Sequence, residues 1–223
     1  ARQKDKGLSL PLESSLIKLF SSEIAEQVSS ESVQLHGGMG YMKEMHVERF
    51  YRDCKLGTIG GGTSEIQRSI IAATLRDFES LQSNLHSAYD EEVREKAASL
   101  AGALPEYEIV NLMAKGIVNL EKNAQKKNNQ PFEFAFADLV TIYSILQVSL
   151  YDLVIQHGHY GFDQKCNDFR LLTQFLLHRY LPALKTLSVL EGQNVTRILK
   201  LYLDLPDPVA FVEQTMTYIT DHV

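Results

Sequence analysis

The sequence lacks the features of a nucleic-acid-binding protein and of a disulfide-stapled secreted scaffold. Lysine and arginine total 22 residues against 28 aspartates and glutamates, which gives a net charge of −6. No basic stripe is therefore available to displace counterions from phosphates, and we expect no nucleic-acid partner. The only two cysteines, Cys54 and Cys166, permit at most one disulfide, which fits a reducing compartment.

Long apolar runs and strand patterns are also missing. The longest uncharged stretch near the middle, 139–151, has about 13 residues, whereas a spanning helix needs ~20, so it predicts a buried core helix rather than a transmembrane segment. The polar start of the chain is not followed by the apolar segment of a signal peptide. We therefore expect an intracellular protein, cytoplasmic in a bacterium or in the mitochondrial matrix of a eukaryote. No sustained period-two alternation predicts a strand.

Helical periodicity runs through nearly all of the apolar segments. Before the glycine pair at Gly37 and Gly38, which supplies left-handed residues to end a helix, one stripe has spacings of three and four and comprises Ile17, Phe20, Ile24, Val28 and Leu35. A short helix is expected over 46–53, with Glu48 placed to pair with Arg52. The next helix begins after a glycine loop, where Ser64 as N-cap and Gln67 three residues later form a capping box.

Beyond residue 78 the chain becomes polar and then resumes a helical pattern. The breakers predict helices over 89–103, 106–124, 132–157, 166–190, 194–204 and 208–220. One stripe in this region is long enough for a core helix, and it comprises Leu139, Ile142, Leu146, Leu150 and Leu153. The sequence thus predicts an all-α protein with two parts, residues 1–78 and residues 79–223.

The loop between the short helix and Ser64 concentrates glycine. Four glycines fall within residues 57–63, of the 13 in the whole chain, directly before a helix start. Such a loop offers backbone amides and a helix dipole to an anion. No lysine follows as in a P-loop, and no strand precedes as in a dinucleotide fingerprint. The residues alone leave two readings equally open, a close ligand contact or a tight structural turn.

Three linked motifs resemble the C-terminal helical domain of the acyl-CoA dehydrogenases. They are a Gln-x-x-Gly-Gly-x-Gly-Tyr stretch at 34–41, a Val-Glu-Arg-x-x-Arg-Asp stretch at 47–53 and a Gly-Thr-x-Glu-Ile stretch at 62–66. The resemblance covers residues ~10–78 and implies the end of a four-helix bundle followed by an additional helical bundle. The later part, 79–223, resembles in architecture the helical extension of very-long-chain-type members.

The resemblance implies a flavoprotein oxidoreductase of fatty acid metabolism, which dehydrogenates acyl-CoA to 2-enoyl-CoA with FAD. Its FAD contacts would be Thr63, Ser64 and Glu65 of one subunit, with Gln34, Leu35, His36, Gly37 and Gly38 reaching the adenosine end of the FAD held by a neighbour. Gly61 and Gly62 would lie against the acyl-CoA substrate. A homo-oligomer (dimer or tetramer) or a second chain carrying the missing domains, and an electron-transfer flavoprotein as acceptor, are the implied partners.

One position departs from the family pattern. Many members carry the catalytic glutamate where this chain has Gly61, and glycine cannot take a proton. Either the base comes from an earlier helix outside this chain, as in isovaleryl- and long-chain-type enzymes, or the protein is a non-catalytic scaffold or partner subunit derived from the family. No catalytic residue is therefore assigned here, and Glu65 is not expected to replace the base. His157 and His159 lack companions at metal-ligand spacing, so no metal is expected.

Overall fold

All regular elements that a computed structural model of the chain describes are α-helices, so the predicted all-α class is confirmed. The residues described are 5, 7, 9–74, 95–96, 104–124, 129–155, 162–191 and 193–204. The chain divides into two compact units, Ala1–Asp77 and Phe78–Val223. The expected helix over 208–220 lies outside the described residues, as does all of 89–103 except 95–96.

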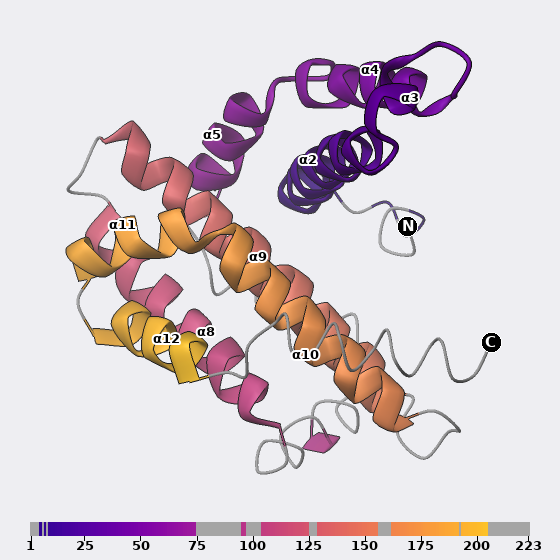
Figure 1. Cartoon of the computed structure of the whole chain (residues 1–223). Coiled ribbons are helices and arrows are strands. Elements are labelled where there is room, and N and C mark those ends of the chain that lie inside the picture. Colours follow the sequence, from indigo (N-terminus) through magenta and orange to yellow (C-terminus); the bar gives the residue numbers. More distant parts are fainter. Residues whose placement is uncertain are drawn as a thin grey trace. The chain divides into compact units, whose positions relative to one another are not determined.

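The N-terminal unit is built on one long helix. Helix α2 (Pro11–Leu35) packs against both α4 (Val47–Ile59) and α5 (Ser64–Thr74), and the short α3 (Gly37–Tyr41) joins its end to α4 (Figure 1). Gly37 has φ +56°, the left-handed conformation predicted at the end of the helix, whereas Gly38 does not. Helix α4 runs six residues beyond the expected end at residue 53, as far as the glycine loop.

The face of α2 that packs against its neighbours is not the one predicted. Ile17, Val28 and Leu35 of the expected stripe are exposed, by 69%, 57% and 87%. The buried side chains of α2 are instead Leu12, Ser15, Leu16, Leu19, Ser22 and Ser29. A Cβ built on Gly57 of α4 would lie 3.4 Å from the Cβ of Ser22, so small residues bring these two helices close together. The hydroxyls cost little to bury there, because Ser22 and Ser29 donate to carbonyls of their own helix.

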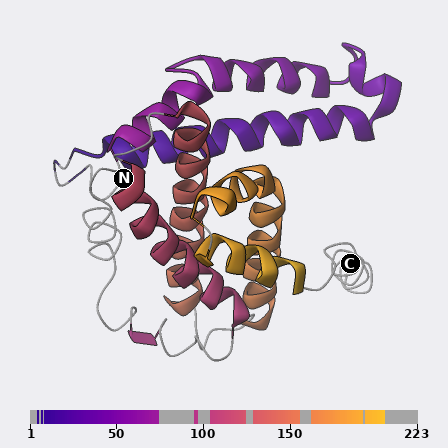
Figure 2. The same cartoon turned by 90° about the vertical axis from the view of Figure 1, so that its left-hand side faces the viewer.

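The C-terminal unit surrounds a central apolar helix. Helix α9 (Gln130–Ile155) packs against α8 (Pro105–Ala124), α10 (Phe162–Arg179) and α11 (Leu181–Glu191), while α12 (Gln193–Asp204) packs against α8 and α11 (Figures 1 and 2). The predicted stripe of α9 is confirmed, since Leu139, Ile142 and Leu146 are fully buried. By length and hydropathy α9 could cross a membrane, but 67% of its most apolar window is buried inside the protein, as in the core helix of a soluble protein.

The single helix expected over 166–190 is wrong, because two helices occupy that range. Helix α10 ends at Arg179 and α11 begins at Leu181, with a turn at Tyr180. Pro182 explains the break: proline lacks the amide hydrogen that a continuous helix would use there, and it is tolerated in the first turn of a new helix.

Candidate functional site

The glycine loop joins α4 to α5 in a conformation that requires glycine. Gly61 has φ +67° and Gly62 has φ +92°, which side chains of L-residues rarely allow. A Cβ on Gly62 would also lie 2.9 Å from Nε2 of Gln67, whereas a Cβ on Gly61 would meet nothing within 4 Å. The loop therefore exposes backbone without side chains, and at Gly62 a side chain would also have to displace the Gln67 amide.

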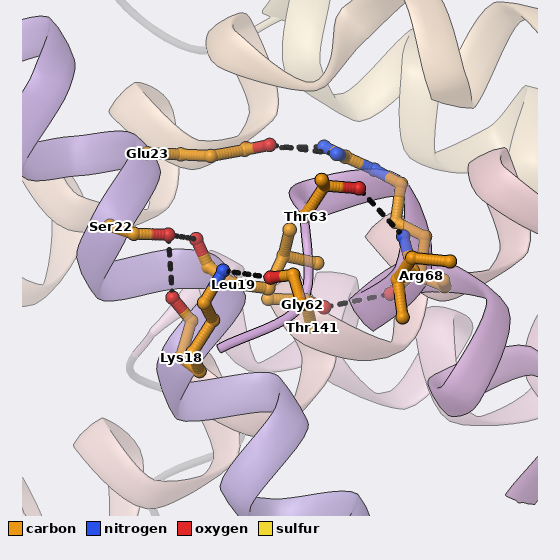
Figure 3. Close-up of polar contacts among 10 residues, drawn as sticks. Lys18, Leu19, Ser22, Glu23, Gly62, Thr63, Arg68 and Thr141 are labelled. Atoms are coloured by element: carbon orange, nitrogen blue, oxygen red, sulfur yellow. Dashed lines mark hydrogen bonds and ion pairs between the residues drawn. The ribbon is translucent and has the colours of Figure 1, made fainter. Parts of the chain in front are cut away.

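Two side chains form hydrogen bonds with the loop backbone, one from α2 and one from α5. Nζ of Lys18 donates to the carbonyl oxygen of Gly62 at 2.5 Å (Figure 3). Nε2 of Gln67 donates to the carbonyl oxygen of Gly61 at 3.0 Å. Sequence reasoning missed both contacts. Lys18 lies 44 residues from Gly62, so no local pattern signals the pair, and Gln67 was assigned to a capping box.

The cap of α5 is one residue earlier than predicted. Thr63, not Ser64, precedes the helix, and its Oγ1 accepts from the amide of Ile66 at 3.4 Å. Ser64 is the first helical residue, and its Oγ is buried without a partner in the part of the chain that the structure describes. Hydrogen bonds from the Thr63 hydroxyl and from its own amide lower the pKa of the Glu65 carboxyl. A lowered pKa makes a carboxylate a weaker base, so this environment does not favour Glu65 as a proton acceptor.

Several amides at this helix start face no acceptor. Among the described residues, the N–H groups of Gly61, Gly62, Thr63 and Ser64 form no hydrogen bond. Free amides at the start of a helix combine hydrogen-bond donors with the positive end of the helix dipole. The loop can therefore receive a group rich in hydrogen-bond acceptors or negative charge.

The second predicted group, Gln34 to Gly38, lies at the other end of α2. All five of its residues are exposed, and Leu35 is 87% exposed. Nδ1 of His36 lies 2.8 Å from the carbonyl oxygen of Ser32, which fixes the imidazole at the helix end. At 1.5 Å per residue, Gln34 lies ~24 Å along α2 from Lys18, which touches the glycine loop. The structure thus does not bring the two predicted groups together within one chain.

The remaining candidates have structural roles. Arg52 pairs with Glu48 at 2.8 Å, as predicted from their spacing, and Arg49 pairs with Asp53 at 3.5 Å. The Arg52 hydrogen bond lowers the pKa of the Glu48 carboxyl. Both cysteines are free and half-buried.

A metal centre finds no support in the described part of the chain. No group of three or more histidine, cysteine, aspartate or glutamate side chains gathers there in a way that could hold an ion. His157 and His159 lie outside the described residues.

These features define the N-terminal unit as a helical hairpin with a glycine loop at one end, and comparisons with known proteins show what this unit is similar to. Residues 1–76 match the C-terminal domain of acyl-CoA dehydrogenases. A probable acyl-CoA dehydrogenase of Bacillus subtilis is 51% identical over 72 residues, 32% of this chain and 19% of that protein. The mitochondrial short-chain specific acyl-CoA dehydrogenase of Rattus norvegicus is 47% identical over 75 residues, 34% of this chain and 18% of that protein.

The match with solved structures extends over more of the chain. An acyl-CoA dehydrogenase of Bacillus anthracis, solved in complex with FAD, aligns with a TM-score of 0.66 and 21% identity over 95% of this chain and 40% of that one. This likeness shows a shared fold. Residues 1–76 are thus similar to the helical C-terminal domain of the acyl-CoA dehydrogenases, and the chain spans about a fifth of the length of the sequence relatives it matches.

Proposed function

We propose that this chain is part of an FAD-dependent acyl-CoA dehydrogenase, to which it contributes contacts with the flavin and a surface for association with further subunits. The observation that carries this proposal is the row of unpaired amides from Gly61 to Ser64, on a loop whose glycines leave the backbone bare. A cofactor with a pyrophosphate and a planar ring requires donors and close approach of that kind. The family match of residues 1–76 supports the same assignment.

The residues present fit the cofactor in a second respect. Oγ of Ser64 is a buried hydroxyl without a partner among the described residues, and a buried polar group in that state costs about 1–3 kcal/mol. A bound acceptor group would remove that cost. We therefore assign Thr63, Ser64 and Glu65 to the flavin of their own subunit. Gln34 to Gly38, at the far end of α2, are assigned to the flavin of a neighbouring subunit.

The chemistry follows from what the chain supplies and what it lacks. Bound FAD would accept the hydride from the β-carbon of the acyl group. Gly61 and Gly62 would let the thioester approach the loop, because neither carries a side chain. The α-proton requires a carboxylate, and Gly61 cannot provide one. The pKa of the Glu65 carboxyl is lowered, which does not favour it as a substitute, and we propose that the base comes from outside this chain.

The proposed partners extend this reading. A subunit of a caffeyl-CoA reductase–Etf complex from Acetobacterium woodii is 48% identical over 63 residues, 28% of this chain and 17% of that protein. This supports an electron-transfer flavoprotein as the acceptor. The exposed apolar residues of the N-terminal unit support a homo-oligomer or association with a second chain. A reducing compartment, the bacterial cytoplasm or the mitochondrial matrix, is the proposed location.

The test compares two glycine-to-alanine variants of the full-length protein. Gly62→Ala places a methyl group at φ +92° and 2.9 Å from Gln67, at a cost of ~1–2 kcal/mol for the backbone alone, so we expect at least about tenfold weaker flavin binding. Gly57→Ala, in the same segment but with ordinary 3.4 Å contacts, should bind flavin as the wild type does. The measurement is the visible absorbance spectrum during flavin titration.

The same samples separate an enzyme from a scaffold. Bleaching of the flavin absorbance on addition of acyl-CoA would support dehydrogenation. A protein that holds flavin but is not bleached would favour the non-catalytic partner subunit. The observation that favours this alternative is Gly61, which stands where many members carry the catalytic glutamate. Equal flavin binding by Gly62→Ala and the wild type would contradict the assignment of the loop.

A further inference from the structure

The two carbonyls that Lys18 and Gln67 hold belong to consecutive residues of the glycine loop. Gly61 and Gly62 are the two left-handed residues of this loop. The carbonyl oxygen of Gly61 accepts a hydrogen bond from α5, and that of Gly62 accepts one from α2, the latter seen in Figure 3. Both donors are part-buried at these contacts, which limits competition from water. We call this pair of side chains the loop clamp.

The loop clamp determines where the amides point. A trans peptide group is planar, and its C=O and N–H bonds point in opposite directions. The carbonyl of Gly61 shares a peptide group with the amide of Gly62, and the carbonyl of Gly62 shares one with the amide of Thr63. Because both carbonyls point toward the clamp, both amides point away from it. These are two of the amides that find no acceptor among the described residues.

A separate ion pair sets the position of the clamp. Arg68 donates two hydrogen bonds to Glu23, at 2.7 and 3.1 Å, and both side chains are 15% exposed (Figure 3). Such bidentate pairs are stronger and more directional than single hydrogen bonds. Glu23 lies on α2 five residues after Lys18, and Arg68 follows Gln67 on α5. The pair therefore fixes α2 against α5 at the level where Lys18 meets the loop.

We propose that Lys18 and Gln67 are positioning residues for the cofactor: they orient the Gly61–Gly62 and Gly62–Thr63 peptide groups so that their amides face the flavin. This inference rests on the proposed function. It adds that glycine permits the loop conformation but does not select it, because glycine populates many conformations about equally. The clamp makes the selection, and the charged donor of Lys18 is its stronger half.

The test uses Lys18→Met, which keeps the length of the side chain and removes the donor, in the full-length protein. Loss of a charged hydrogen bond of this kind corresponds to about ten- to hundredfold weaker binding of FAD, measured by flavin fluorescence titration. Lys18→Arg retains a donor and should recover most of the affinity. Lys55→Met is the matched control, because Lys55 likewise makes a contact between helices, a 2.7 Å ion pair with Glu26 of α2, but does not touch the loop.

Melting temperature and amide exchange of the flavin-free variants separate positioning from stability. We expect Lys18→Met and Lys55→Met to melt alike, with faster exchange of the Ile66 and Gln67 amides only in Lys18→Met, since those amides bond to Thr63 directly after the clamped peptides. Equal FAD affinity in the two variants overturns the proposal. The proposal is also overturned if the loss of FAD affinity parallels a drop in melting temperature and Lys18→Arg does not restore the affinity. A wild type that binds no flavin contradicts the proposed function, and amide exchange then still decides whether the clamp orders the loop.

Discussion

The glycines of the N-terminal unit differ in the reason why a side chain is unfavourable at their positions. Gly62 combines a left-handed backbone with a close contact, Gly61 is left-handed in open space, and Gly40 is the reverse case, with an ordinary φ but no room. A Cβ on Gly40 would lie 2.6 Å from the carbonyl oxygen of Val33 and 2.7 Å from the Cβ of His36. The last turn of α2 thus packs directly on the backbone of α3.

Gly40→Ala should destabilise the N-terminal unit. The added methyl group meets backbone that cannot move aside without shifting α3 against α2, and overpacking of this kind costs about 1–3 kcal/mol. Gly38→Ala is the matched control, since its Cβ would meet nothing within 4 Å and its φ is not left-handed. Thermal unfolding followed by circular dichroism measures the difference. An unchanged melting temperature for Gly40→Ala would show that the contact can relax.

The sequence identified these glycines as a group but could not rank them. The glycine pair at Gly37 and Gly38 and the loop at Gly61 and Gly62 are visible as clusters in the sequence, and the left-handed φ of Gly37 was predicted. The steric limit at Gly40 comes from the path of the preceding turn, which only coordinates reveal. At Gly38 the chain itself leaves space for a side chain, which the sequence cluster does not reveal either.

At the scale of elements, the Thr63 hydroxyl at the start of α5 both caps the helix and forms a hydrogen bond with the Glu65 carboxylate. Thr63→Val removes the acceptor for the Ile66 amide and the hydroxyl that donates to Glu65. We expect the pKa of Glu65 to rise toward its usual value of 4.5 and the unit to lose ~1 kcal/mol, as when other threonine caps are removed. The pKa is measured by NMR titration. Thr74→Val, which removes a hydroxyl bonded to Ile70 at the other end of α5, is the control.

The sign of the pH dependence follows from the lowered pKa. A carboxyl whose pKa is lower in the folded protein than in the unfolded chain stabilises the fold above its unfolded pKa. That contribution is lost as the pH falls through the folded pKa. The melting temperatures of wild type and Thr63→Val should therefore differ most near pH 7, and the difference should shrink below about pH 4.5 to the part that comes from the lost cap of the Ile66 amide. A constant difference across this range would mean that the Glu65 contact contributes nothing.

Helix positions could be predicted from periodicity, but helix faces could not always be. In α9 the apolar stripe is the buried face, because the helix is surrounded by partners on several sides. In α2 the exposed residues Ile17 and Val28 outrank the buried Ser22 on any hydropathy scale. Close contact between α2 and α4 selects small side chains, and their seven-residue spacing at 15, 22 and 29 was the available signal. Pro182 was a comparable signal for the break between α10 and α11.

At the scale of the whole molecule, the two units differ in how much apolar surface they leave uncovered. In the described part of the C-terminal unit the exposed large apolar side chains are Ile155, Phe175, Val189 and Leu203. The N-terminal unit exposes Ile17, Val28, Leu35, Met39, Tyr41, Met42, Phe50, Tyr51, Leu56, Ile59, Ile66 and Ile70. Single exposed apolar residues are ordinary, but a concentration of this kind marks an interaction surface. An interaction surface would explain why the apolar side chains Ile17, Val28 and Leu35 of α2 are exposed in the unit itself.

Leu56→Glu should therefore weaken association of the full-length protein while leaving its helices intact. Leu56 is 67% exposed on α4, so a charge there costs little in the free unit but is expensive to desolvate in an interface. We expect the dissociation constant of the oligomer to rise at least about tenfold, measured by sedimentation at several concentrations. Val189→Glu, at a residue of α11 that is 86% exposed, should leave the dissociation constant of the oligomer unchanged. If both variants sediment as the wild type does, α4 is not part of an interface. A monomeric wild type would leave the apolar face of the N-terminal unit to be covered by a different chain, which the intact mass of co-purifying polypeptides would identify.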